Sequence, residues 1–282
     1  MNGDSRDPSR RSVLAALGAA AAGAVGRPAG GTERERPEAG ARRPRGSVRG
    51  AEFSRVVAGR TYRLRYRRRV AGRPRTVRVD VPRERYRAAR AADRSLVGTF
   101  EAALGNDLAA AVAGSLGAAL TAGGVDDPLA RLRAAVGFVR RLPYEPDAES
   151  VGEAGYPRYV AETLVDHVGD CEDYAALLAG VVAAPPFDLD PALVLLPGHV
   201  GVGVDPDAVG ADGLPTLRVA GREYLYLDAT YRVGLGTLPA DHDEGVVAVR
   251  DGGWLVGDPG AFAAHVREAA ALHAAARRPA SR

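Results

Sequence analysis

The chain has 282 residues, of which 46% are hydrophobic, a length and composition typical of one large or two modest globular domains. Its single cysteine, Cys171, excludes an intramolecular disulfide and any zinc site built from several cysteines. The net charge of +3 is unevenly distributed along the chain. Residues 1–95 contain 25 arginines and 9 acidic residues, whereas residues 96–282 contain 13 arginines and 26 acidic residues. Nucleic-acid binding therefore cannot be centred on the acidic part, which contains Cys171.

Residues 1–26 have the pattern of an export signal. A polar start with Arg10 and Arg11 precedes an apolar run over residues 13–25, and the stretch SRRSVLA resembles a twin-arginine signal. This run is short for a transmembrane helix, and the alternatives are an uncleaved anchor and a disordered basic tail. Residues 27–55, rich in Pro, Gly, Arg and Glu, are expected to form a disordered linker.

Two alternating stretches predict a β-hairpin over residues 61–82. The first, TYRLRYRRRV, places Tyr62, Leu64 and Tyr66 on one face and arginines on the other, and the second, TVRVDVP, repeats the alternation with valines. The hairpin should bury one face and present a strongly basic one. That basic face is either solvated, or docked on the acidic remainder of the chain, or in contact with an anionic surface polymer or membrane.

The rest of the chain predicts helices followed by strands. Residues 84–142 are mostly helical in pattern, with Asp126 or Asp127 capping a helix that has Pro128 in its first turn. Residues 143–235 form the expected catalytic core, with a structured loop over 143–160 and short strands at 192–196, 199–204 and 224–227. A helix and tail are expected over residues 259–282. This order predicts an α+β domain over residues 56–258, with helices packed on an antiparallel sheet.

The stretch GDCEDYAALLAGVV, residues 169–182, is where we expect the chemistry. Apolar residues at helical spacing predict a helix that begins at Cys171, with Asp170 as N-cap and Asp173 reaching back as in a capping box. Free backbone N–H groups and the positive end of the helix dipole favour a thiolate at this position. The alternative is a small buried side chain at the start of a core helix.

His199 begins a predicted strand and Asp228 ends another. If these strands are neighbours against the Cys171 helix, the three side chains converge, as cysteine-dependent acyl transfer requires. The blocks GDCEDYAALLAGVV, LVLLPGHVGVGV and REYLYLDATY resemble the three motif blocks of the transglutaminase-like superfamily. The closer resemblance is to transglutaminase-like putative cysteine peptidases of archaea and bacteria, and it covers residues 60–255.

This resemblance implies a papain-like cysteine protease fold with a Cys-His-Asp triad. Cys171 would be the nucleophile, His199 the general base, and Asp228 the residue that holds the imidazole in its productive tautomer. The backbone N–H of Cys171 would supply one oxyanion-hole donor.

The remaining polar residues are interpreted as structural or exposed. Tyr156 and Tyr159 are candidates for the second oxyanion-hole donor, and the alternative is that they pack their loop against the core. Glu162 and Thr163 are interpreted as structural. The other histidines are expected in exposed settings, with His167 in a surface turn, followed by His242, His265 and His273. Because no spacing resembles a zinc site, and Asp205 and Asp207 form no calcium loop, we predict neither a metal nor a cofactor.

Together these features predict an exported cysteine enzyme that hydrolyses a peptide or amide bond through a thioester, either extracellular or held at the cell surface. Hydrolysis is favoured over cross-linking, which needs a site that excludes water and admits an amine. The alternative is a non-catalytic transglutaminase-like module that binds or scaffolds at the cell surface. Expected partners are a peptide or protein substrate and, through the Arg-rich hairpin, an anionic surface polymer or membrane; nucleic acid is not expected.

Overall fold

The computed structural model describes residues 48–70, 72–242 and 246–257, together with the single positions 260, 264 and 267. The predicted signal, residues 1–26, lies outside the described residues, and so do the linker up to residue 47 and most of the predicted C-terminal helix and tail. The linker prediction, which extends to residue 55, is wrong at its end. Strands β1 (Val48–Arg49) and β2 (Phe53–Ala58) begin earlier, and the buried ring of Phe53 ties β2 to the core.

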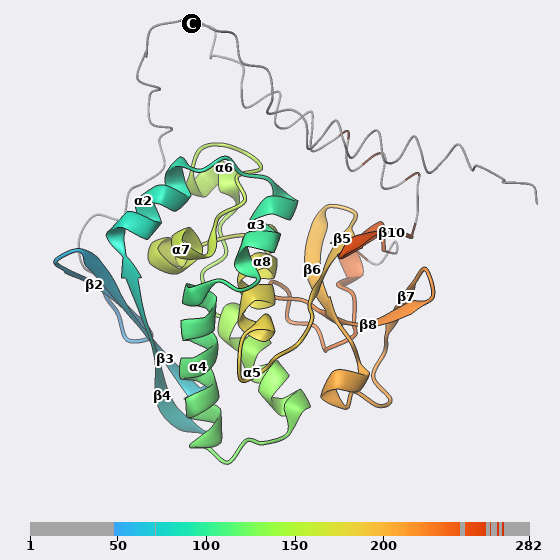
Figure 1. Ribbon diagram of the computed structural model, residues 1–282, viewed down its shortest axis with the longest axis horizontal. Coiled ribbons are helices and arrows are strands. Elements are labelled where there is room, and N and C mark those ends of the chain that lie inside the picture. Colours follow the sequence, from blue (N-terminus) through green and yellow to red (C-terminus); the bar gives the residue numbers. More distant parts are fainter. Residues whose placement is uncertain are drawn as a thin grey trace, which may run out of the picture.

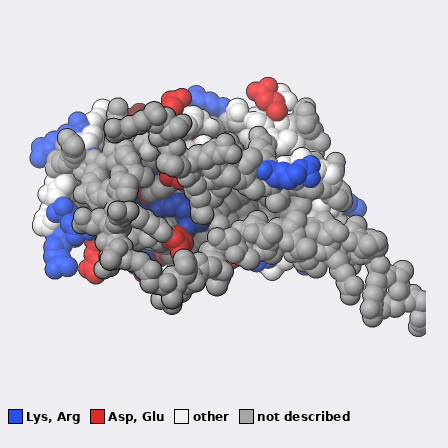
Figure 2. Space-filling model, turned by 90° about the horizontal axis from the view of Figure 1, so that it is seen from above, with Lys and Arg blue, Asp and Glu red and all other residues white. Residues whose placement is uncertain are grey.

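Strands β1 and β2 join β3 (Thr61–Val70) and β4 (Arg73–Pro82) in an antiparallel sheet of order β1-β2-β3-β4. The predicted hairpin is present as β3 and β4, with Tyr62 opposite Val81. Side chains alternate along β3, so one face is buried and the other carries exposed arginines. Basic side chains accordingly gather at the end of the molecule where this sheet lies (Figure 2).

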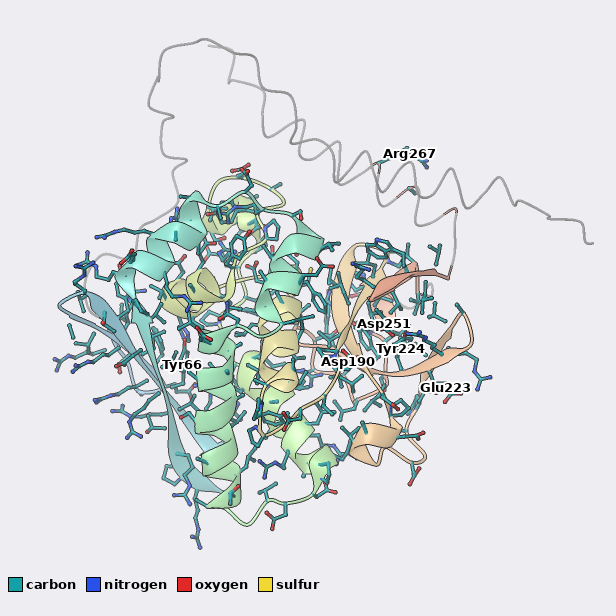
Figure 3. The ribbon with its side chains drawn as sticks, in the orientation of Figure 1. Tyr66, Asp190, Glu223, Tyr224, Asp251 and Arg267 are labelled. Atoms are coloured by element: carbon teal, nitrogen blue, oxygen red, sulfur yellow. The ribbon has the colours of Figure 1, made fainter. Side chains whose placement is uncertain are left out.

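The helices lie on the side of this first sheet that its buried face points to (Figure 1). They are α2 (Arg83–Ala91), α3 (Leu96–Ala103), α4 (Asp107–Thr121), α5 (Pro128–Val139) and α8 (Cys171–Ala183), with the shorter α6 (Asp147–Ser150), α7 (Val160–Glu162) and the π-helical turn η1 (Thr163–His167). Asp127 caps α5 as predicted, since its carboxylate accepts the Ala130 N–H. Tyr66 projects from β3 toward the helices (Figure 3), and its hydroxyl donates to the Leu164 carbonyl at 2.9 Å.

The remaining strands form a second antiparallel sheet of order β10-β9-β5-β6-β8-β7. Its strands are β5 (Ala192–Leu196), β6 (His199–Val204), β7 (Leu217–Val219), β8 (Arg222–Leu227), β9 (Ala248–Asp251) and β10 (Gly253–Val256). Strands β6 and β8 are neighbours, with Val202 opposite Leu227. The ends of the two strands that carry the sequence-predicted site residues therefore lie side by side.

Helix α8 is the central element, because it packs against α3, α4, α5 and β6 together. The α+β class is confirmed, but the strands divide between two sheets with the helices between them, whereas the sequence order predicts a single sheet (Figure 1). The reason is that β4 leads directly into α2, and the helices then separate the hairpin from the later strands. Within the described ranges no single helix has the length and apolarity to span a membrane, although α3 and α4, bent by 52°, pass that test as a pair.

Candidate active site

Cys171 is the first residue of α8. The Asp173 half of the predicted capping box is present, since its Oδ2 accepts the backbone N–H of Asp170 at 3.3 Å. Gly169 packs so closely against Asp173 and Tyr174 that an added Cβ would lie 2.8 Å from the Asp173 side chain. A residue with a side chain would therefore not fit at position 169 without displacing the first turn of α8.

The thiol of Cys171 lies in a negatively charged setting. Its Sγ is 3.1 Å from Glu172 Oε2, and a backbone hydrogen bond links it to Val200, the residue after His199. Burial, followed by the charges of Glu172 and Asp170, raises the pKa of the thiol well above its ordinary value. This opposes the sequence-based expectation that the helix start favours a thiolate, because desolvation and the neighbouring acidic side chains disfavour the charged form of the thiol.

His199 and Asp228 form a buried pair. His199 begins β6, Asp228 follows β8, and the ring Nε2 lies 2.8 Å from Asp228 Oδ2. The Tyr226 hydroxyl donates to the same oxygen at 2.9 Å, while the backbone N–H groups of Thr230 and Tyr231 donate to Oδ1. Burial alone would raise the pKa of Asp228, but the hydrogen bond and charge of His199 and the backbone donors hold it below its ordinary value.

The structure brings Cys171 beside the His199–Val200 segment but does not join the thiol to the imidazole, because Sγ is engaged with Glu172. His199 uses Nε2 for Asp228, so Nδ1 is the ring nitrogen left for a thiol.

His242 differs most from its predicted role. Instead of an exposed position, it stacks on the His199 ring with centroids 4.8 Å apart and planes at 22°. Its Nδ1 lies 2.8 Å from the Pro197 carbonyl and its Nε2 lies 3.1 Å from the Tyr231 hydroxyl. It ends the short 3-10 helix η3 (Ala240–His242), far from His199 along the chain, and the sequence gives no signal for this contact.

His167 also departs from the predicted surface turn. Its ring stacks on Phe53 with centroids 3.6 Å apart, and burial, with help from Arg68 and Arg55, lowers its pKa to about 4. The prediction failed because the partner lies in β2, within the segment expected to be a linker. His265 and His273 lie outside the described residues.

The tyrosines proposed as oxyanion donors are engaged elsewhere. The Tyr156 hydroxyl donates to Glu162 Oε1 at 2.8 Å, and the Tyr159 hydroxyl donates to the Asp93 carbonyl at 2.6 Å. Glu162 is fully buried and pairs with Arg94, which agrees with its structural interpretation, and the Thr163 hydroxyl donates within its own turn. The packing alternative therefore describes these residues.

Three carboxylates meet beside the thiol. Asp147, Asp170 and Glu172 each offer an oxygen within 4.8 Å of the others. Asp170 Oδ1 is buried without a hydrogen-bond partner, and burial, followed by the charge of Asp173, raises the pKa of Asp170 to about 10. The three oxygens lie close enough together to supply part of the ligand shell of a hard divalent cation such as Ca²⁺, but Asp147 already accepts hydrogen bonds from Arg158 and from the Tyr156 N–H. Such a cation would offset the charge that raises the thiol pKa. The sequence analysis does not anticipate this cluster, because Asp147, at the start of α6, is far from Asp170 and Glu172 along the chain.

Comparison with known proteins identifies no family. No family model and no curated protein matches the chain. Among solved structures, EGTA-treated and untreated LapG of Legionella pneumophila each have 17% identity and cover 62% of this chain and 98% of theirs, with TM-scores of 0.35 and 0.34. Calcium-bound LapG has 19% identity and a TM-score of 0.32 and covers 58% of this chain and 88% of its own. Because these likenesses are low, the function has to be inferred from the site itself.

Proposed function

We propose that this protein is an exported cysteine peptidase or amidase that hydrolyses its substrate through a thioester. The supporting observation is the buried His199–Asp228 pair, hydrogen-bonded at 2.8 Å, on the strand end beside which Cys171 opens α8. An ionised carboxylate on one ring nitrogen stabilises an imidazolium and fixes the tautomer in which the other nitrogen accepts a proton.

The proposed reaction starts when the Cys171 thiol turns from Glu172 to His199 Nδ1. The ring accepts the thiol proton while Sγ bonds to the substrate carbonyl carbon, and the carbonyl electron pair moves onto its oxygen. The backbone N–H of Cys171, at the start of α8, donates to this oxyanion. The tetrahedral species then expels the amine, which takes the proton from His199, and water releases the acid from the thioester by the same route.

Carboxylates near the thiol also support a role for a divalent cation in this proposal. Asp147, Asp170 and Glu172 would hold it, and its charge would favour ionisation of Cys171. The reaction as proposed needs no further cofactor.

Export and partners extend the proposal. The twin-arginine pattern at Arg10 and Arg11 supports export, and the outward arginines of β3 suit an anionic surface polymer or membrane. The raised pKa of the Cys171 thiol favours a second candidate, a non-catalytic binding module of the same fold at the cell surface.

Alkylation of the full chain by iodoacetamide between pH 4 and 9 separates the two candidates. An enzyme predicts that Cys171 reacts in the folded protein with added Ca²⁺ below the ordinary thiol pKa of about 8.5, and that His199→Ala abolishes this reactivity. Cys171→Ser controls for labelling elsewhere. If Cys171 reacts only on unfolding, with or without Ca²⁺, the binding module replaces the enzyme.

A further inference from the structure

Arg68 is a cation on the buried face of β3. It shares that face with Tyr62, Leu64, Tyr66 and Val70, and only 7% of its surface is exposed. Its Nη1 donates to the backbone carbonyls of residues 52 and 67, whereas Nε and Nη2 are buried without partners. None of the ion pairs among the described residues includes it. A buried guanidinium with two unpartnered nitrogens and no ion pair is destabilising, so an additional anion would be favourable at this position.

The surroundings of Arg68 compensate its charge only in part. Its guanidinium carbon lies 5.6 Å from the Tyr66 ring centroid and 5.5 Å from that of Phe138, close enough for cation–π attraction. Burial lowers the pKa of Arg68, the charges of Glu52 and Tyr66 oppose this shift, and the nearby charge of Arg141 adds to it. The two aromatic rings and the charge of Glu52, which forms no ion pair with Arg68, therefore compensate the buried guanidinium only in part.

Arg68 lines a cavity of about 340 Å³ between β3, α4 and α5. Three further arginines line it: Arg69, Arg133 and Arg141. None of them forms an ion pair with a described carboxylate. The apolar part of the lining includes Val70, Leu120 and Phe138. The cavity thus combines a strongly basic rim with an apolar wall, which is the chemistry of a site for an anion that carries an apolar group.

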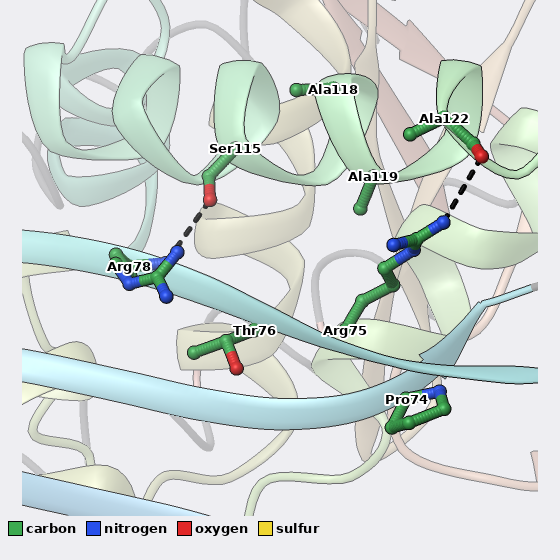
Figure 4. A pocket seen from close by; sticks show the side chains of 8 residues that line it. All are labelled: Pro74, Arg75, Thr76, Arg78, Ser115, Ala118, Ala119 and Ala122. Carbon is green, nitrogen blue, oxygen red and sulfur yellow. Dashed lines mark hydrogen bonds between the residues drawn. The ribbon is translucent and has the colours of Figure 1, made fainter.

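A neighbouring groove of about 400 Å³ between β4 and α4 gives a useful contrast (Figure 4). There Arg75 donates to the Ala122 carbonyl at 3.0 Å, and the backbone N–H of Arg78 donates to Ser115 Oγ at 3.1 Å. Arg68 also uses one nitrogen within the protein, so the difference lies in the lining: this groove has two arginines and small alanines, whereas the cavity at Arg68 has four arginines and larger apolar side chains. The stronger case for an anion lies at Arg68.

We propose that the cavity at Arg68 binds an amphiphilic oxyanion, a carboxylate or phosphate carried on a short apolar group. The oxyanion would accept hydrogen bonds from the arginines, and the apolar group would cover Val70, Leu120 and Phe138. The site lies on elements that hold none of the proposed catalytic residues, so it does not depend on the proposed enzymatic function.

Isothermal titration of the full chain at constant ionic strength tests this proposal with octanoate, octyl phosphate, inorganic phosphate and octyltrimethylammonium, all below micelle-forming concentrations. We expect at least one octyl anion to bind at least about tenfold more tightly than inorganic phosphate, since burial of methylene groups adds affinity. The preferred octyl anion identifies a carboxylate or a phosphate head group. Equal binding of inorganic phosphate, comparable binding of the octyl cation, or no binding of either octyl anion would overturn the proposal.

Variants locate the site. Arg133→Ala and Arg141→Ala change exposed side chains and should each weaken binding about five- to tenfold. Arg68→Met removes the buried charge with similar volume, so it should keep the fold and weaken binding at least as much. Arg65→Ala, on the exposed face of the same strand, is the matched control. If Arg65→Ala weakens binding as much as Arg133→Ala, general surface charge explains it and the site is rejected.

Discussion

At the scale of single residues, two electrostatic effects oppose each other at Cys171. The start of α8 favours a thiolate, whereas burial and the carboxylates of Glu172 and Asp170 raise the thiol pKa, and the second effect is the larger. For Asp228 the balance is opposite, because its hydrogen bonds hold its pKa below the ordinary value and favour the ionised form. The His199–Asp228 pair is therefore arranged to accept a proton, whereas the raised pKa of the Cys171 thiol opposes its release.

Asp228→Asn tests whether the His199–Asp228 hydrogen bond supports the reactivity of Cys171. The amide keeps the shape but loses the charge that stabilises an imidazolium, so we expect the Cys171 alkylation rate of the folded protein with Ca²⁺ to fall at least about 100-fold at pH 7. Mass spectrometry of the labelled peptide measures the rate. Asp190→Asn, at an exposed site with no hydrogen bond, is the control. An unchanged rate in Asp228→Asn would show that His199 works without this partner.

At the scale of elements, α8 holds the site by being packed on several sides. Gly180 allows α8 to approach α3 and α4, since an added Cβ would lie 2.5 Å from the Ala103 carbonyl oxygen and 2.8 Å from the Ala109 Cβ. The same close packing fixes where the first turn of α8, and thus Cys171, lies relative to β6. Helix packing and site geometry are therefore coupled.

Gly180→Ala should destabilise the protein by about 1–3 kcal/mol, because backbone atoms have to move to admit the methyl group. Gly114→Ala is the matched substitution on α4, where an added Cβ meets nothing within 4 Å. Gly114→Ala should stabilise the folded protein by about 0.5–1 kcal/mol, because alanine lowers the entropy of the unfolded chain. Urea unfolding of both variants gives the comparison, and equal effects would refute the packing of α8 described above.

At the scale of the whole molecule, charge is distributed unevenly between the two ends. Arginines occupy the outer face of the first sheet and the cavity at Arg68, whereas carboxylates gather around Cys171. Arg158 is buried among the carboxylates and pairs with Asp147 at 2.7 Å and Asp173 at 2.6 Å. Burial raises the pKa of Asp147 to about 7 and that of Asp173 to about 8, so the folded chain retains protons that the unfolded chain has released.

Stability should therefore fall as pH rises from 5 to 8 in EDTA, because the unfolded state binds fewer protons than the folded state in this range. Ca²⁺ at 100 times its Kd should offset the loss and raise Tm by about 5 °C or more. Scanning calorimetry measures both effects. Asp170→Asn should abolish the Ca²⁺ effect and Asp190→Asn should leave it intact. A Tm that is insensitive to Ca²⁺ would exclude cation binding at Asp147, Asp170 and Glu172.

The sequence by itself determined the local features of this protein. Period-two alternation located β3 and β4, and helical spacing together with Asp170 located the start of α8 at Cys171. Strand patterns also placed His199 and Asp228 at the ends of two strands. These features follow from residues close in the chain, whose geometry is set by backbone dihedrals and by the burial of one face.

Only the tertiary structure decided the features that depend on packing. It separated the strands into two sheets, stacked His242 on His199, and brought Asp147 to Asp170 and Glu172. It also buried Arg68 at a position where alternation alone assigns an inward side chain but cannot say what surrounds it. The thiol pKa depends on desolvation and on charges from separate segments, and neither is encoded in the spacing of residues along the chain.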